Sequence, residues 1–356
     1  MSSDAKSNQF SIADPPSDAI SSIQFSPHAG SHKLVVSSWD KHAYIYELSQ
    51  GKSCTQVAKF EHAAPVLDAC FGEDDNVIYT AGLDMSVIRI DVSNGETQVM
   101  STHTSGVKSV VYSKQHNILV SAAWDSTLHI HHGGVPGESD QRPAKIELPS
   151  KPHALDLSTT KLVVVMASRA LYIYELSSLS QALKSSAGQS PAVLKTEPWQ
   201  HRESSLKFMT RAVSCMPNDE GYATSSIEGR VAVEWFDPSN DSQARKYAFK
   251  CHRQPVDDVD VVYPVNSIAF HPIHGTFATG GGDGVVAIWD AVAKRRIRIY
   301  PKLASSIAGL SFSSDGKYLA TAISPGFEDG KDELAEGTVG VYLRELGENE
   351  VKRKAK

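Results

Sequence analysis

The residues of this chain that could support catalysis occur only in incomplete patterns. Ser204-Ser205-Leu206-Lys207 has the S-x-x-K form in which a serine is activated for acyl transfer, but the S-D-N and K-T-G elements that accompany it are absent. The glycine-rich Gly280–Gly284 lacks the Lys-Ser/Thr pair and the following helix of a phosphate-binding loop. We therefore predict no catalytic residues and a protein that is not an enzyme.

A histidine cluster, His129, His131 and His132, offers the imidazole nitrogens that zinc prefers as ligands. His129 and His131 share one face of a predicted strand, and His131 falls where the best-formed repeat unit of the chain has a tryptophan. Because that position is structural, we favour a structural role over a metal site. We predict neither a metal ion nor a cofactor.

Residues that could bind a partner form clearer patterns than residues that could catalyse a reaction. Arg211, Arg230 and Lys250 fall in one part of the chain, and guanidinium groups bind carboxylates and phosphates through a planar fork of donors. Trp39 and Trp124 each precede a turn aspartate, where an exposed indole can anchor a partner. Two alternatives stay open. Each cation could be an ordinary solvated side chain, and each tryptophan could pack on a neighbouring unit.

The elements that position these residues are short strands. The segment 264–290 contains three apolar runs, Val265–Phe270, Thr276–Thr279 and Val285–Trp289, which alternate loosely at period two between turn residues. This pattern predicts three consecutive antiparallel strands. A further strand is predicted just upstream at Lys246–Cys251.

The same segment carries the polar residues of a WD40 blade. His252, Thr279, Asp283 and Trp289 match a buried relay, in which a turn aspartate fixes a histidine and a hydroxyl links that histidine to an indole N–H. A buried polar chain of this kind is tolerated only when every member has a partner. We predict a structural role for these four residues.

The relay recurs along the chain at the WD40 period. Asp40, Asp84 and Asp125 lie 44 and 41 residues apart, within the roughly 40–45 residues of one repeat. In two of these units a histidine precedes the aspartate by 22 residues and a Ser or Thr precedes it by four. These residues are His62 and Thr80 before Asp84, and His103 and Ser121 before Asp125. Two offsets that repeat together identify a repeat architecture.

Seven units can be counted, centred near residues 40, 84, 125, 169, 228, 283 and 325, with Arg169 and Glu228 in place of the aspartate in two of them. The last unit has only three strands of its own, and Asn8–Ala13 alternates correctly to supply the fourth. We predict an all-β, seven-bladed WD40 β-propeller at residues 8–346, closed by this N-terminal strand. Residues 1–7 are expected to form a flexible N-terminus and 347–356 a frayed basic tail.

The amino-acid composition of the chain argues against some classes of function. With 41 acidic against 35 basic residues, the net charge of −6 argues against direct nucleic-acid binding. The four cysteines show no paired spacing, which indicates buried thiols in a reducing compartment. No secretory signal and no membrane span are predicted, so we expect a cytosolic or nuclear protein. The basic Lys352–Lys356 is interpreted as a solvated tail, with a weak nuclear-import signal as the alternative.

Several segments strongly resemble the mitotic-checkpoint WD-repeat proteins of the budding-uninhibited-by-benzimidazole class. The most specific are SSIEGRVAVE (Ser225–Glu234) and KYAFKCHR (Lys246–Arg253), and the similarity covers essentially the whole propeller. The messenger-RNA export propeller of the nuclear pore is a related family that shares the SIEGRVA signature. The insertions Asp140–Pro149, Ser177–Pro191 and Pro325–Gly337 are not predicted by the family pattern.

The resemblance implies a non-enzymatic spindle-checkpoint adaptor, monomeric within hetero-complexes, located in the nucleus, at the kinetochore in mitosis and also in the cytoplasm. Such proteins bind an acidic motif of the checkpoint kinase and of its pseudokinase-like relative. The matching positions are Arg211, with Arg230 nearby, and the face that carries Trp39 and Trp124. The family also binds phosphorylated Met-Glu-Leu-Thr repeats of the kinetochore scaffold, for which Arg230 and Lys250 match. The alternative is an mRNA export propeller that binds the same type of acidic motif.

Overall fold

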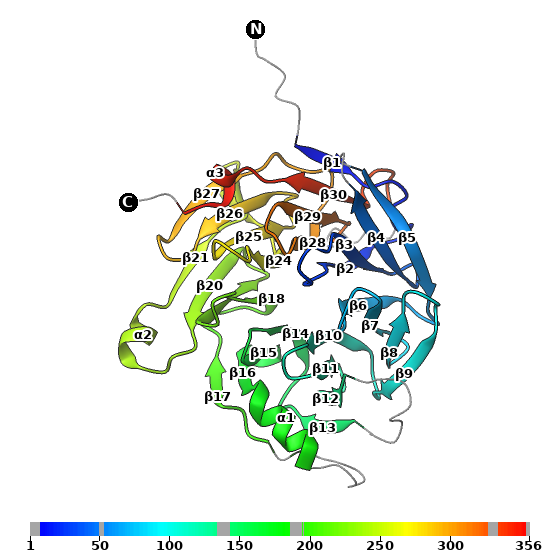
Figure 1. The fold of residues 1–356 in the computed structure, drawn as a ribbon. Helices are drawn as coiled ribbons and strands as arrows, with labels where there is room; N and C mark the ends of the chain where they lie inside the picture. Colours follow the sequence, from blue (N-terminus) through cyan, green and yellow to red (C-terminus); the bar gives the residue numbers. More distant parts are fainter. Residues whose placement is uncertain are drawn as a thin grey trace.

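Seven four-stranded antiparallel sheets stand around a central channel in the computed structural model of the chain (Figure 1). The structure describes residues 8–49, 53–133, 143–185, 194, 196–326 and 334–353. Each sheet forms one blade, and the predicted seven-bladed propeller is thereby confirmed. None of the helices in the described part of the chain is long and apolar enough to cross a membrane.

The strands of each blade are given from the channel outward. Blade 1 contains β2 (Ile20–Phe25), β3 (Lys33–Ser38), β4 (His42–Ser49) and β5 (Ser53–Glu61). Blade 2 contains β6 (Val66–Phe71), β7 (Val77–Gly82), β8 (Ser86–Asp91) and β9 (Thr97–Thr102). Blade 3 contains β10 (Val107–Ser113), β11 (Ile118–Ala123), β12 (Thr127–His132) and β13 (Ala144–Glu147). Blades 4 and 5 contain β14 (Pro152–Leu157), β15 (Lys161–Met166), β16 (Ala170–Glu175), β17 (Gln200–Glu203); β18 (Thr210–Cys215), β19 (Gly221–Ser226), β20 (Arg230–Trp235), β21 (Tyr247–Lys250). Blades 6 and 7 contain β24 (Val265–Phe270), β25 (Thr276–Gly281), β26 (Val286–Asp290), β27 (Arg295–Ile299); β28 (Ile307–Phe312), β29 (Tyr318–Ile323), β30 (Gly340–Glu345), β1 (Gln9–Ser11).

The ring is closed by its first strand. β1 pairs antiparallel with β30, so that Gln9, Phe10 and Ser11 stand opposite Arg344, Leu343 and Tyr342. The contact continues beyond the strand, because the amide of Ile12 donates to the carbonyl of Val341 over 3.0 Å. The closure by Asn8–Ala13 predicted from the sequence is confirmed. It covers a strand edge that would otherwise be open.

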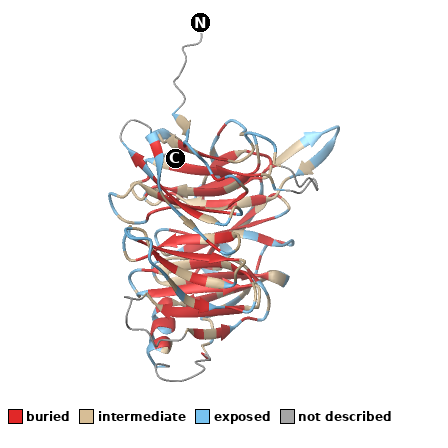
Figure 2. Cartoon of the chain, turned by 90° about the vertical axis from the view of Figure 1, so that its right-hand side faces the viewer, coloured by how far each residue is buried: buried red, intermediate tan, exposed pale blue. Residues whose placement is uncertain are grey.

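The core lies between the blades, as the buried strands in Figure 2 show. β7, β11, β19 and β25 are buried at every residue, because the second strand of a blade is covered on both faces by its neighbours. Small residues allow this approach. A Cβ added to Gly280 would lie 2.3 Å from Ile307 of the next blade, so the spacing of blades 6 and 7 requires glycine there.

Two of the three segments that the family pattern does not predict contain regular structure. The run Ser177–Pro191 overlaps helix α1 (Leu176–Ser185), and residues 186–191 lie outside the described ones. Asp140–Pro149 includes β13, the outer strand of blade 3, so the interpretation of this segment as an insertion was wrong for residues 144–147. A short helix, α2 (Asn240–Ala244), and a separate hairpin of β22 (Arg253–Val256) and β23 (Val259–Val262) flank β21. Of Pro325–Gly337, residues 327–333 lie outside the described ones.

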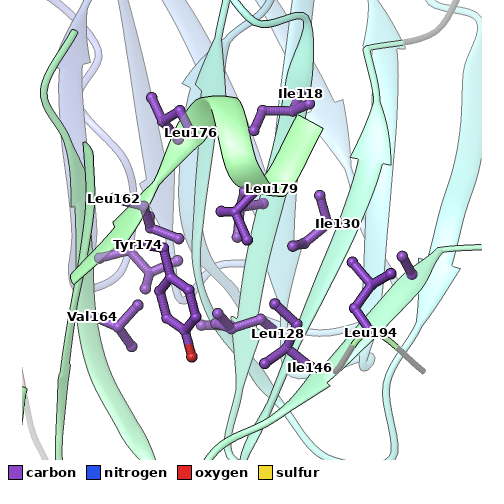
Figure 3. Close-up of a cluster of buried hydrophobic side chains, with 14 of the residues drawn as sticks. Ile118, Leu128, Ile130, Ile146, Leu162, Val164, Tyr174, Leu176, Leu179 and Leu194 are labelled. Atoms are coloured by element: carbon purple, nitrogen blue, oxygen red, sulfur yellow. The ribbon is translucent and has the colours of Figure 1, made fainter. Parts of the chain in front are cut away.

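Helix α1 covers the outside of blades 3 and 4 (Figure 3). Leu176, Leu179 and Leu183 recur at the spacing of one helical face and are buried there. They pack against side chains from both blades, among them Ile130 and Leu162. This apolar stripe explains why a Ser- and Ala-rich segment folds as a helix.

The C-terminal segment departs from the expected frayed tail. Gly347–Arg353 contain helix α3 (Glu348–Val351), whose Val351 is buried in the core of blades 6 and 7. The hydroxyl of Thr276 donates to the carbonyl of Val351 over 2.8 Å, and Arg298 forms a 3.0 Å ion pair with Glu350. The expectation was wrong for these residues because one buried valine holds the segment. Lys354–Lys356 lie outside the described residues.

Candidate functional site

The polar relay of blade 6 is complete. The indole Nε1 of Trp289 donates to Thr279 Oγ1 over 2.8 Å, and Thr279 Oγ1 lies 2.9 Å from Nε2 of His252. His252 Nδ1 lies 2.9 Å from Oδ1 of Asp283. An indole can only donate, so the threonine hydroxyl donates to Nε2 and the histidine N–H on Nδ1 faces the carboxylate. A Cβ on Gly281 would come within 2.3 Å of the histidine, which is why glycine stands there.

The equivalent residues of blades 2 and 3 form shorter versions of the relay. In blade 3, His103 lies 3.2 Å from Asp125 Oδ2 and 2.9 Å from Ser121 Oγ. In blade 2, His62 Nε2 lies 2.9 Å from Thr80 Oγ1, but its Nδ1 faces the carbonyl of its own strand, at Phe60. The three blades therefore provide a graded series for measuring what the turn aspartate contributes.

The histidine cluster of blade 3 is built into the core. His129 Nδ1 and His131 Nε2 lie 3.2 and 3.0 Å from the hydroxyl of Ser101, and the His129 ring stacks on His103 at 3.5 Å between centroids. Among the described residues, no group of three or more His, Cys, Asp or Glu side chains could hold a metal ion. The geometry agrees with the structural role that the sequence favoured.

Acid should destabilise the protein partly through this cluster. Burial, with His129 and His103 adding to it, lowers the pKa of His131 to about 3. Because the unfolded pKa lies near ~6.5, the stabilisation is fully present above that pH and is lost as the pH falls towards 3. We expect His131→Gln to reduce the loss of unfolding free energy between pH 7.5 and 4.5 by up to about 2 kcal/mol. Denaturant titrations at the two pH values measure this, and His201→Gln, at a side chain that is 54% exposed, is the control. An unchanged pH dependence in His131→Gln would contradict the expectation.

The S-x-x-K residues do not form a reactive pair. Ser204 is buried and its hydroxyl accepts the amide of Leu206, whereas Lys207 is exposed. Ser205 donates to Glu234 over 2.8 Å. All three groups are explained by the turn that leads into β18.

One mouth of the channel forms a cavity of about 760 Å³. The second residue of every innermost strand lines this cavity. In the order of the blades these residues are Ser21, Leu67, Lys108, His153, Arg211, Asn266 and Ala308. Three consecutive blades therefore contribute Lys108, His153 and Arg211 at equivalent positions. Trp39 and Trp124 line the same cavity, so the structure brings these two tryptophans together with Arg211.

The electrostatics of this mouth favour an anion. Arg211 Nε donates to Asn266 Oδ1 over 3.1 Å, and its terminal nitrogens have no acceptor among the described residues. Burial lowers the pKa of His153, and the charges of Lys108 and Arg211 lower it further. Burial also lowers the pKa of Lys108, although the nearby Asp68 opposes this. A carboxylate entering the cavity meets Lys108 and Arg211, and Asp18 is the one acidic residue among those that line it.

Exposed apolar side chains accompany the cations. Trp39 is 44% exposed, whereas Trp124 is half-buried because its ring lies against Gly106. Further exposed apolar residues stand on the loop before β18 and on the turns before β8 and β20: Phe208, Met209, Ile227 and Met85. Apolar groups exposed next to a charged cavity mark an interaction surface. Trp39 is thus the freer of the two indoles.

Arg230 and Lys250 lie outside this cavity, on the two outer strands of blade 5. They stand directly opposite each other in the β20–β21 pairing, and Lys250 is exposed. Like charges in this arrangement are destabilising unless an anion lies near. Glu228 provides one at 3.2 Å from Arg230 Nε, on the same turn. Arg211, Arg230 and Lys250 occupy the same end of blade 5, on its innermost, third and outermost strands, without a described contact between Arg211 and the other two.

Lys108 and His153 are residues of this site that the sequence reasoning missed. Their position in the repeat could have identified them, because each is the second residue of an innermost strand, as Arg211 is. His153 lies one blade before Arg211, and Lys108 lies two blades before it. Aligning the seven units at that position would have found them.

Comparison with known proteins identifies the family. A WD domain, G-beta repeat model matches residues 95–132 and 245–290. The chain is 42% identical over 346 residues to the mitotic checkpoint protein BUB3.1 of Arabidopsis thaliana, covering 97% of this chain and 95% of that protein. This chain belongs to the Bub3 family of mitotic checkpoint proteins. The resemblance seen in the sequence is thereby confirmed.

Two further relatives of this Bub3-family chain are a second mitotic checkpoint protein and an RNA export protein. It is 37% identical over 338 residues to the mitotic checkpoint protein bub3 of Dictyostelium discoideum, covering 93% of each. It is also 33% identical over 320 residues to the poly(A)+ RNA export protein of Schizosaccharomyces pombe, covering 88% of this chain and 83% of that protein. The related export family named from the sequence is therefore present among the relatives.

Proposed function

We propose that this chain is a non-enzymatic adaptor of the spindle assembly checkpoint. It binds an acidic motif of checkpoint kinases, including a pseudokinase-like relative, across the channel mouth. It also binds phosphorylated Met-Glu-Leu-Thr repeats of the kinetochore scaffold at blade 5. In this way it recruits the kinases to unattached kinetochores. The protein acts in the nucleus, at kinetochores during mitosis and in the cytoplasm, as a monomeric propeller within hetero-complexes.

Two features support the acidic-motif site. Arg211 offers its terminal guanidinium nitrogens to a carboxylate, in the same cavity as Lys108 of blade 3. Trp39 and Trp124 supply apolar surface at the other side of the same cavity, and Arg230 lies farther out on the same blade. A segment with acidic and apolar residues matches this combination.

The observation that carries the phosphate site is the like-charged pair Arg230 and Lys250. Two cations directly opposite each other on neighbouring strands repel, and Glu228 offsets only part of that repulsion. A phosphothreonine brings roughly −1.5 to −2 charges and three acceptor oxygens. Placed between the two cations it converts the repulsion into charge-assisted hydrogen bonds.

A second candidate is the mRNA export propeller, because the chain is 33% identical to a poly(A)+ RNA export protein. It would use the same type of acidic motif at the nuclear pore. The net charge of −6 favours the checkpoint function over one that requires a basic, RNA-contacting surface.

Localisation in living cells separates the two candidates. In cells whose microtubules are depolymerised, a fluorescent fusion of this protein should form kinetochore foci, and Lys250→Ala should lose most of that signal. Lys246→Ala, at an exposed lysine of the same segment, should keep the foci. Foci that persist in Lys250→Ala would contradict the phosphate site. A nuclear-rim signal without foci, with poly(A)+ RNA retained in the nucleus on depletion, would support the export function instead.

A further inference from the structure

The hairpin of β22 and β23 stands out from the body of the propeller on its own (Figure 2). Neither strand pairs with a third one in the described part of the chain. A two-stranded hairpin without a packed face is marginal in water. Its sequence nevertheless places aliphatic residues in solvent: Val256, Val259 and Val262 are 47%, 64% and 36% exposed. Nothing in the function proposed above uses this element.

The hairpin is preorganised at both ends. At its base, the amide of Tyr263 donates to the carbonyl of His252 over 3.0 Å, and Arg253 Nη2 donates to the carbonyl of Glu228 over 2.9 Å. At its tip, Asp257 and Asp258 both adopt positive φ, 47° and 62°, which is the two-residue turn that matches the twist of a hairpin. The element is therefore held in one position without a partner.

One of its two edges is better suited to pairing than the other. In antiparallel strands, residue pairs alternate between those that bond each other and those whose N–H and C=O point outward. Because Val256 and Val259 flank the turn as a bonded pair, Pro255 and Asp260 point their backbone groups outward. Proline has no N–H, so the β22 edge lacks a donor there. The β23 edge keeps the outward donors and acceptors of Asp260 and Val262.

The charges define what can pair with β23. Asp257, Asp258 and Asp260 crowd the tip, and all three are exposed. Asp260 and Val262 face one side of the hairpin, whereas Val259 and Val261 face the other. An added strand would place basic side chains beside Asp260 and aliphatic ones beside Val259. A second copy of this chain would bring aspartates against aspartates, and a nucleic acid would meet the same acidic tip.

We propose that β23 is a docking edge for an extended partner segment in which basic and aliphatic residues alternate. The main-chain bonds to Asp260 and Val262 hold the segment, and the alternation fixes which face it presents. No hairpin residue lines the channel-mouth cavity, whereas the base of the hairpin adjoins Gly229, next to Arg230. Loss of the β23 edge should leave binding of the acidic motif unchanged.

The test uses the full-length protein labelled with 15N-valine and an eight-residue probe of alternating lysine and valine. We expect the outward amide of Val262 to exchange with solvent more than tenfold more slowly with saturating probe, while the inward amide of Val261 changes little. A peptide of the same composition with its lysines and valines in two blocks is the control for charge alone.

Two variants test the side-chain and backbone parts of the proposal. Asp260→Lys should weaken probe binding at least tenfold, and Glu96→Lys, which changes the net charge equally on blade 2, should not. Val262→Pro removes the outward donor and should abolish binding at an unchanged melting temperature. The proposal is overturned if the blocked peptide binds as well, if Asp260→Lys binds normally, or if light scattering shows that β23 pairs two copies of the chain.

Discussion

Asp283→Ala should lower the free energy of unfolding by about 3 kcal/mol, because it leaves a buried histidine without its charged partner. Both side chains of the pair are nearly inaccessible, at 5% for Asp283 and 2% for His252. The carboxylate also accepts the amide of Val285 over 3.1 Å, so the turn loses a bond as well. Differential scanning calorimetry should show a lower melting temperature by several degrees, given roughly 2–4 °C per kcal/mol in domains of 150–250 residues.

Blade 2 supplies the matched control for this result. Asp84 occupies the same turn position and accepts the amide of Ser86 over 3.1 Å, but His62 does not bond to it. Asp84→Ala should therefore cost about 1 kcal/mol, the value of one ordinary hydrogen bond. Equal destabilisation by Asp84→Ala and Asp283→Ala would show that the turn, and not the relay, carries the stability.

Arg211→Ala should weaken binding of the acidic motif by about 10- to 150-fold, corresponding to the 1.5–3 kcal/mol of a charge-assisted hydrogen bond. The loss follows because Arg211 is exposed at the channel mouth and its terminal nitrogens are available to a carboxylate. Isothermal titration with the motif of the checkpoint kinase measures the effect. Thermal stability should stay near that of the unmodified protein.

Two controls accompany the Arg211 variant. Lys207→Ala removes an exposed cation four residues away that does not line the cavity, and it should bind normally. The pKa of His153, which the charge of Arg211 lowers, should rise in Arg211→Ala, and an NMR titration of the imidazole detects this. Unchanged motif binding with the expected rise at His153 would show that Arg211 faces the cavity without contacting the ligand.

The fold was predictable because its signals are local and repeat. The aspartates at 40, 84 and 125 and the offsets to His62 and His103 fix the blade period, and each offset reflects contacts within one unit. The closing strand was predictable for the same reason, since an unpaired edge at β30 needs an alternating partner.

The missed elements depend on contacts between distant segments. α3 has only four residues and no periodic pattern, and it is held by the burial of Val351 in the core shared by blades 6 and 7. The β22–β23 turn has two aspartates at positive φ instead of the usual glycine or asparagine, so its sequence lacks the usual hairpin signal. In α1 the signal was present, because Leu176, Leu179 and Leu183 have helical spacing, but the serine-rich composition obscured it.

Part of the candidate site could likewise be predicted from the sequence, and part could not. Arg211, Trp39 and Trp124 were named from sequence, and the structure places all three at one cavity. Lys108 and His153 enter it from other blades, and only an alignment of the seven units at the start of the innermost strand would have found them. The pairing of Arg230 with Lys250 likewise depends on how β20 meets β21.

In the function proposed here, blade 5 binds the phosphate of a kinetochore peptide while the channel mouth holds the acidic motif of a kinase. Fluorescence anisotropy of a Met-Glu-Leu-Thr peptide, phosphorylated or not, with the acidic kinase motif present at saturation, tests it directly. We expect binding only of the phosphorylated peptide, a loss of at least tenfold in Lys250→Ala, and no loss in Lys246→Ala. Equal binding of the two peptides, or full binding by Lys250→Ala, would show that blade 5 does not recognise the phosphate.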